Sequence, residues 1–412
     1  MKEEILNHIH QPAELEKLYR SQKGQFKRVF AEIYPSIQDQ PIARFWNERL
    51  NFESDGISWG SKTEFILVVS LGLIAGLYAK FPAIFSIDEE FFFPRNLSFL
   101  VFPFLAVYFA WKNQIAPKKI IPIAAIIGIC LVYINLIPDN QNDITLLIFI
   151  HMPLLLWGVL GMAFSGAEIN NLDSRLAYLR FNGDAIVMGA VLFLAGAVLS
   201  GLTVGLFNLI GINIEEFYAK YILVFGAASI PPFATFLTQT NPQLVNKVSP
   251  VIAKIFSPLV LVMLVTYLIA IVYSGKDPYN DREFLLLFNM LLIGVLALIF
   301  FSIAESSEEQ KISSSWVLTA LSAVTIIVNG IALSAIVFRI SEWGITPNRL
   351  AVLGVNVLML VHLIMVFRSL WIAINQKKNI YMVGRTIAIY LPIYFLWTVI
   401  VVFVFPFVFG FD

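Results

Sequence analysis

Apolar runs of roughly twenty residues follow one another from residue 63 onward. As an α-helix, such a run spans about 30 Å of hydrocarbon, because each residue rises about 1.5 Å. The pattern predicts an all-α, polytopic transmembrane helical bundle of about eleven spans. The runs lie near 64–85, 97–111, 119–138, 144–164, 184–211, 217–239, 251–274, 283–304, 315–340, 348–373 and 385–408. The run at 97–111 is short, since Pro94, Arg95 and Asn96 interrupt its start.

Residues 1–62 are polar, with charges of both signs, and they contain no apolar run of membrane-spanning length. Apolar residues recur there at helical spacing, at Phe26, Val29, Phe30, Ile33, Ile42, Phe45, Trp46 and Leu50. This periodicity predicts two or three short amphipathic helices, separated at Pro35 and near Pro41. The chain is therefore expected to divide into a cytosolic helical segment, 1–62, and a transmembrane domain, 63–412. The segment is either a simple cap or a site for a protein partner.

The charged residues predict the orientation of the bundle. If the N-terminus lies inside, the inner segments hold twenty-one of the 28 Lys and Arg residues, as the positive-inside rule requires. The N-terminus is then cytoplasmic and the C-terminus periplasmic. The chain has 28 acidic residues as well, so no overall basic bias suggests a nucleic-acid partner. With 58% hydrophobic and 14% charged residues, the partner that composition requires is the lipid bilayer.

Two segments predict departures from simple membrane spans. Before the fifth run, Leu172, Leu176 and Leu179 share one helical face, which predicts a helix lying in the membrane interface. Arg175 and Arg180 would there meet anionic headgroups, and Asn182 with Gly183 would form a turn into the fifth span. In the sixth run, Pro231 and Pro232 are adjacent, which predicts a kink or a break and a possible substrate site beside it.

A polar stripe runs along the ninth span. Its members fall on one face of about 120°: Ser315, Thr319, Ser322, Thr325 and Asn329. The tenth span offers Asn356 and His362 at comparable depth. These side chains cannot face hydrocarbon without cost, so they either line a hydrated path or join helices by hydrogen bonds. Two Gly-x-x-x-Gly pairs, Gly72 with Gly76 and Gly201 with Gly205, indicate close helix packing.

The chain contains none of the common signatures of metalloproteases, P-loop proteins or serine hydrolases. No catalytic, metal-binding or cofactor-binding residue is therefore expected, and we predict that the protein is not an enzyme. Cys130 is the single cysteine, so no intrachain disulfide can form.

The loop before the tenth span carries the most distinctive local pattern. Thr346 is placed to cap the helix and Pro347 to occupy its first position, with Asn348 and Arg349 directly after them. The Gly-Ile-Thr-Pro-Asn-Arg stretch, preceded by Phe338 and Arg339, resembles a bacterial multi-pass family known as domain of unknown function 4153. The resemblance implies an inner-membrane location and a multi-pass architecture, and it implies no activity.

Two functions remain compatible with these patterns. The first is a transporter-like or permeation protein that uses the polar stripe, the Pro231 region and the outer Arg349 loop, with an unknown small-molecule substrate. The second is a non-transporting scaffold or sensor that binds a protein or lipid partner. A hydrated space bounded by Asn329, Asn356 and His362 favours the first, whereas a sealed, dry bundle favours the second.

Overall fold

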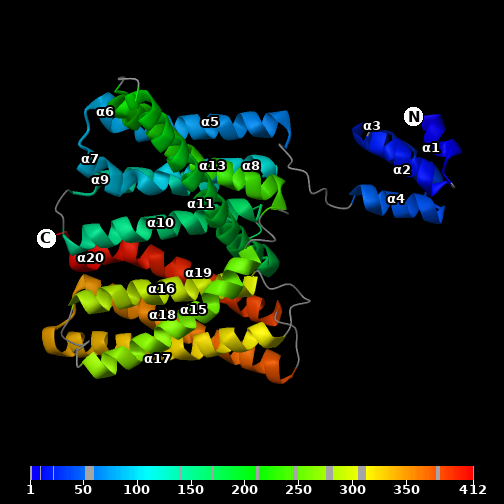
Figure 1. Cartoon of the computed structure of the whole chain (residues 1–412). Helices are drawn as coiled ribbons and strands as arrows, with labels where there is room; N and C mark the ends of the chain where they lie inside the picture. Colours follow the sequence, from blue (N-terminus) through cyan, green and yellow to red (C-terminus); the bar gives the residue numbers. More distant parts are fainter. Residues whose placement is uncertain are drawn as a thin grey trace. The chain divides into compact units, whose positions relative to one another are not determined.

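The structure is a computed structural model of the chain. It describes residues 2–411 apart from 10, 22, 52–59, 139–141, 167, 169, 210–212, 243, 245–248, 275–281, 305–311 and 377–380. The chain forms two compact units, Met1–Ser58 and Trp59–Asp412, and Figure 1 shows their helices.

The N-terminal unit contains four described helices with a core of their own. The helices are α1 (Lys2–Asn7), α2 (Pro12–Ser21), α3 (Lys23–Ile37) and α4 (Pro41–Asn51). Their buried residues form one cluster: Ile5, Ile9, Leu15, Phe26, Phe30, Ile33, Ile37, Ala43, Trp46 and Leu50. Arg49 lies 4.8 Å from the centre of the Trp46 ring and forms an ion pair with Glu16 at 2.7 Å. The unit is thus a small helical fold in its own right.

Two details of the N-terminal prediction are wrong. Pro35 does not separate two helices, because it lies inside α3, whereas Pro41 begins α4 as expected. Pro35 has no N–H to donate to the carbonyl of Ala31, and α3 continues for only two residues beyond it. Phe45 was placed on the apolar face, but its side chain is 61% exposed, and Ala43 is buried in the core instead. The apolar face of a helix can be shifted by one or two residues and still fit the same spacing, so the sequence did not show which of these two residues faces the core.

The membrane unit is an all-α bundle, as predicted. Its α-helices are α5 (Lys62–Ala79), α6 (Phe81–Phe85), α7 (Glu89–Asn96), α8 (Phe102–Lys112), α9 (Pro117–Leu136), α10 (Asp143–Phe164), α11 (Leu172–Leu209), α12 (Glu215–Phe217), α13 (Val224–Thr240), α15 (Ser249–Ser274), α16 (Arg282–Ala304), α17 (Ile312–Trp343), α18 (Pro347–Asn375), α19 (Tyr381–Val399) and α20 (Phe405–Phe409). In the described part, nine apolar spans are long enough to cross a membrane, and α15 and α16 contribute two shorter apolar stretches. The multi-pass membrane prediction is confirmed.

Two hydrophobic cores lie side by side within this unit. The N-terminal core joins α5, α8, α9, α10 and α13, and the C-terminal core joins α15, α16, α17, α18 and α19. In Figure 1 the early helices lie toward one edge of the bundle, with α5 outermost, and α17 lies toward the opposite edge. The helices α10, α11 and α19 contact members of both groups, so they connect the two cores.

The span predicted at 97–111 begins earlier than expected. One apolar helical stretch covers Glu89–Lys112, with Pro94 inside α7 and a 3-10 turn at Leu97–Leu100. Arg95, one of the residues that interrupt the apolar run in the sequence, is fully buried with its guanidinium 3.8 Å from the centre of the Phe91 ring. The aromatic partner makes burial of the charge tolerable.

The predicted interfacial helix and turn before the fifth span are wrong. Residues Leu172–Leu209 form the single long helix α11. Gly183 lies against Phe301, and a Cβ atom there would stand 2.0 Å from the nearest ring atom. Asn182 accepts a hydrogen bond from Trp157 Nε1 at 2.9 Å. The Asn-Gly pair therefore packs one helix against others and does not form a turn.

Arg175 and Arg180 bond to helix carbonyls within the protein, which corrects the expectation that they meet headgroups. Arg180 Nε donates to the carbonyl of Ala304, the last residue of α16, at 2.8 Å. Arg175 donates to the carbonyl of Ala388 at 3.0 Å. That carbonyl lies four residues before Pro392, which has no N–H to give it, so the arginine satisfies a position that the proline leaves open.

The two Gly-x-x-x-Gly pairs have different surroundings. Cβ atoms at Gly72 and Gly76 would come within 2.6 Å of Ser229 and 2.3 Å of Phe225, so α5 packs closely on α13 there. At Gly201 and Gly205 no atom lies within 4 Å of such a Cβ atom. Close packing through small residues is thus present at the first pair.

Candidate functional site

The polar stripe of α17 is buried between helices. Ser322, Thr325 and Asn329 are each fully buried, and Thr319 nearly so. The hydroxyl of Ser322 donates to the carbonyl of Leu318 at 2.8 Å, and that of Thr325 to the carbonyl of Leu321 at 2.6 Å. Hydroxyl groups in membrane helices commonly bond back to their own helix in this way. The Ser315 side chain lies outside the described residues.

Asn329 belongs to a ladder of three asparagines on three helices. Its Nδ2 donates to Asn356 Oδ1 on α18 at 3.3 Å. Nδ2 of Asn356 donates in turn to Asn289 Oδ1 on α16 at 2.6 Å. Side-chain amides can accept and donate at once, so one such residue on each helix links α16, α17 and α18 at one depth.

The orientation of each amide in the ladder follows from its neighbours. Asn356 Nδ2 also donates to the carbonyl of Val352 at 2.8 Å, so exchanging its amide oxygen and nitrogen would bring two acceptors together. Asn356 must therefore present its oxygen to Asn329, and Asn329 must answer with its nitrogen. The Oδ1 atom of Asn329 consequently has no protein partner although it is fully buried.

His362 occupies an aromatic site two turns further along α18. Its Nδ1 lies 3.2 Å from the hydroxyl of Tyr394, and its ring stacks on Tyr390 with centroids 4.4 Å apart. Phe300 of α16 approaches the ring from another side, at 4.6 Å. The imidazole is fully buried, and its Nε2 atom has no partner among the residues that the structure describes.

The prolines of the sixth span do not break the helix. α13 runs from Val224 to Thr240 through Pro231 and Pro232, and a π-helical segment, Tyr218–Leu223, precedes it. Pro232 is buried, and the contacts of α13 with α5 extend along the helix. Of the two expected outcomes, a kink or a break, the break is therefore wrong. Close packing on α5 compensates for the lost backbone hydrogen bonds, which local sequence does not reveal.

The outer-loop motif forms the joint between α17 and α18. Thr346 caps α18 by accepting from the backbone N–H of Arg349 at 3.3 Å, and Pro347 begins the helix. The Arg349 guanidinium donates to the carbonyls of Trp343 at 2.8 Å and Gly344 at 2.7 Å, at the end of α17. Asn348 is half-buried beside them. The motif closes a hairpin by satisfying both helix ends.

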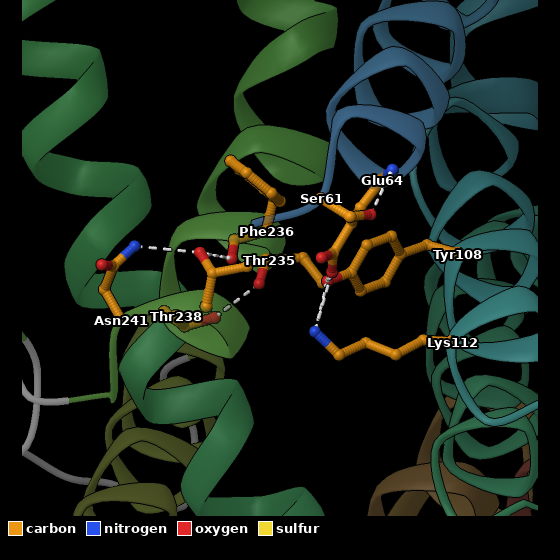
Figure 2. A network of polar contacts seen from close by, with 9 residues as sticks. Ser61, Glu64, Tyr108, Lys112, Thr235, Phe236, Thr238 and Asn241 are labelled. Carbon is orange, nitrogen blue, oxygen red and sulfur yellow. Dashed lines mark hydrogen bonds and ion pairs between the residues drawn. The ribbon is translucent and has the colours of Figure 1, made fainter. Parts of the chain in front are cut away.

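Sequence reasoning missed a cluster around Glu64, which Figure 2 shows. The Oε1 atom of Glu64 accepts from the Tyr108 hydroxyl and from Lys112 Nζ, both at 2.8 Å. The signal was present, because Ser61 and Glu64 have the spacing of a capping box, and the Ser61 hydroxyl does accept from the Glu64 N–H at 3.1 Å. The contact joins the start of α5 to the end of α8, so both ends lie on one face of the membrane.

The Glu64 cluster is explained by helix ends. A carboxylate in the first turn of α5 and an ammonium in the last turn of α8 each complement the dipole of their own helix. Gly60, with a φ of +59°, lies so close that a Cβ atom there would be 2.8 Å from Glu64 Oε2. The cluster therefore fastens the entrance of the first span, and we assign it no chemistry.

Comparison with protein-family models, curated proteins and solved structures gives no match for this chain. Among the described residues, no group of three or more His, Cys, Asp or Glu side chains is arranged to hold a metal ion. The candidate site must therefore be judged on its own geometry. The strongest candidate is the mid-depth set in the C-terminal core, formed by Asn329, Asn356 and His362.

Proposed function

We propose that this multi-pass membrane protein is transport-like and that its working part is the C-terminal core. The observation that carries the proposal is the buried imidazole of His362, hydrogen-bonded to Tyr394 through Nδ1 while Nε2 has no partner. The Oδ1 atom of Asn329 is a second buried polar atom without a partner in the same core. An ionisable side chain inside a span is by default a candidate for function.

The energetic argument is that such atoms are expensive to keep. A buried donor or acceptor without a partner costs about 1 to 3 kcal/mol. A helix interface built only for stability gains nothing from this cost, because apolar residues of similar size would pack there as well. A site that exchanges a proton or a small polar molecule needs groups that remain available for it. The two open atoms support this second use.

A specific observation favours the alternative, a non-transporting scaffold or sensor. Ser322 and Thr325 turn their hydroxyls back to their own helix, and the Asn ladder ties three helices together, as hydrogen-bonding glue does. The N-terminal unit, with its own core, would then be the part that meets a protein partner. In this reading the two open atoms are a tolerated defect.

Cysteine accessibility separates the two functions. In a protein carrying Cys130→Ala, cysteine replaces Asn329, and a small water-soluble thiol reagent is added to membranes at neutral pH. Transport-like opening predicts labelling at 329. Two controls lie beside it, Ile327→Cys, whose position is 57% exposed on the outer surface, and Val328→Cys, which is fully buried. Neither should react. If the cysteine at 329 is as unreactive as the one at 328, the scaffold or sensor is the better supported of the two functions.

A further inference from the structure

We propose that His362 is a proton-binding site whose occupancy controls how α19 packs against α18. This inference rests on the transport-like function proposed above, and it names the proton as the ion that the site takes up. It draws on two observations, the aromatic site around His362 and the local construction of α19.

The site is built to hold one form of the imidazole. A neutral imidazole has one N–H donor and one acceptor, whereas an imidazolium has two donors that both require acceptors. The Nδ1 atom has the Tyr394 oxygen at 3.2 Å, but Nε2 has no acceptor in this conformation. The structure therefore accommodates the neutral ring. An imidazolium requires a conformation in which water or another acceptor reaches Nε2.

Among the described residues, no charged side chain of the neighbouring helices serves as an acceptor for Nε2. The helices packed against α18 are α10, α16, α17 and α19. Among the described side chains of α16, from Phe288 to Ala304, none titrates, and the charged residues of α17, Arg339 and Glu342, lie in its last turns.

The remaining neighbours carry few titratable groups as well. α10 offers Asp143 at its start and His151, whose Nδ1 bonds to the Leu147 carbonyl at 2.8 Å. α19 offers Arg385 and the two tyrosines in contact with His362, Tyr390 and Tyr394. α18 itself carries Arg349 at its start and Arg368, which is about 9 Å further along the helix than His362.

Two features allow the helix that contains α19 to bend near its contact with His362. Pro392 lies between Tyr390 and Tyr394 and frees the carbonyl of Ala388, to which Arg175 donates. Directly after α19, the helix continues as a π-helical segment, Ile400–Val404. Proline positions and π-helical turns are where helices bend and where functional helices change shape. Protonation of His362 would disrupt the hydrogen bonding that suits the neutral imidazole. This change would occur beside the part of α19 that bends most easily.

Spin-label distances test this link between protonation and movement. In a Cys130→Ala protein, labels are placed at Phe407 in α20, which follows the π-helical segment, and at Ile345 in the turn between α17 and α18. Both side chains are well exposed, at 91% and 64%. The distance distribution is measured by electron paramagnetic resonance in liposomes between about pH 8 and pH 5, the range in which histidine changes charge. We expect the distribution to shift with pH in the otherwise native protein.

Three variants decide the outcome. His362→Gln should abolish the pH-dependent shift, and Tyr394→Phe, which keeps the ring and removes only the hydroxyl, should displace its midpoint. His151→Gln, at the buried histidine of the other core, should leave the shift unchanged. No shift in the native sequence, or a shift that survives in His362→Gln, would overturn the inference. Labelling of cysteine 329 is measured at neutral pH and tests the transport-like function. Failure of that function would therefore be seen in the labelling, separately from the spin-label distances.

Discussion

The two cores of the membrane unit place their polar side chains at different depths. In the N-terminal core they lie toward the two ends of α5, where Tyr78 reaches Asn96 at 2.7 Å and Glu64 reaches Lys112 at 2.8 Å. These two networks are separated by about 21 Å along the helix. In the C-terminal core, Asn329 and His362 lie in the interior of α17 and α18.

The two cores also differ in which polar groups are paired. Asn96 and Asn135 exchange two amide hydrogen bonds, at 2.9 and 3.0 Å. In the C-terminal core, the side-chain nitrogen of Asn329 has a hydrogen-bond partner but the side-chain oxygen has none. In His362, Nδ1 has a partner but Nε2 has none. Polar pairs near helix ends can also be completed by water, whereas those at mid-depth depend on the protein. The N-terminal core has buried polar atoms without a partner as well, the hydroxyls of Thr145 and Thr235 and the indole nitrogen of Trp397. The difference is therefore one of kind, because the C-terminal core leaves an imidazole nitrogen and an amide oxygen open in its interior.

The largest expected effect concerns topology and is all-or-none. A reporter that is active only in the periplasm should be active after the final residue and inactive within 375–378. The reason is the excess of Lys and Arg in the segments that we predict to lie inside, together with the stretch Glu89–Lys112, which is long and apolar enough to cross. The opposite pattern would show that our count of spans is wrong by an odd number, with the stretch at 97–111 the first suspect.

The second largest effect is expected when Glu64 in the N-terminal core loses its ion-pair partner. Lys112→Met should destabilise the protein by about 2 kcal/mol, because it leaves the Glu64 carboxylate without its counter-charge in a largely buried place. Thermal unfolding in detergent measures the effect. Lys220→Met removes an ion pair of exposed side chains and should change little. Equal effects of the two substitutions would contradict our account of the Glu64 cluster.

A matched pair of substitutions tests the difference in pairing directly. Asn96→Leu breaks a reciprocal amide pair and should cost about 1 to 2 kcal/mol, because it takes the donor from Asn135 Oδ1 and the acceptor from the Tyr78 hydroxyl. Asn329→Leu removes an oxygen that has no partner but leaves Asn356 Oδ1 without its donor, so one unpaired acceptor replaces another and the net effect on thermal stability should be close to zero. A larger loss for Asn329→Leu than for Asn96→Leu would reverse the comparison between the cores.

The smallest effect is expected at the outer joint of the C-terminal core. Arg349→Ala removes two hydrogen bonds to the carbonyls that end α17, and it should cost about 1 kcal/mol. A lower melting temperature of the purified protein would show this. Arg349→Lys should recover only part of the loss, because a shorter side chain with a strongly hydrated ammonium replaces the Nη1 group that donates to both carbonyls. An unchanged melting temperature for Arg349→Ala would show that Thr346 and Pro347 close the joint without the arginine.

The sequence by itself determined where most of the helices lie. Long apolar runs leave an α-helix as the only way to satisfy the backbone in lipid, so the bundle follows from composition and length. Thr346, Pro347 and the capping pair at Ser61 also act locally, and their roles can be predicted from spacing. The sequence also predicts that the stripe through Ser322, Thr325 and Asn329 faces protein or water, since its polar groups cannot face hydrocarbon without cost, and these side chains are buried.

Only the tertiary structure decided which partners these side chains find. Asn182 and Gly183 read locally as a turn, yet α11 continues through them because Trp157 and Phe301, from other helices, fill the space beside them. Arg175 meets the carbonyl that Pro392 frees, and Asn289 completes the asparagine ladder from a third helix. Such contacts depend on how distant segments pack. Local periodicity gives the face on which a residue lies, but not the helix that will cover it.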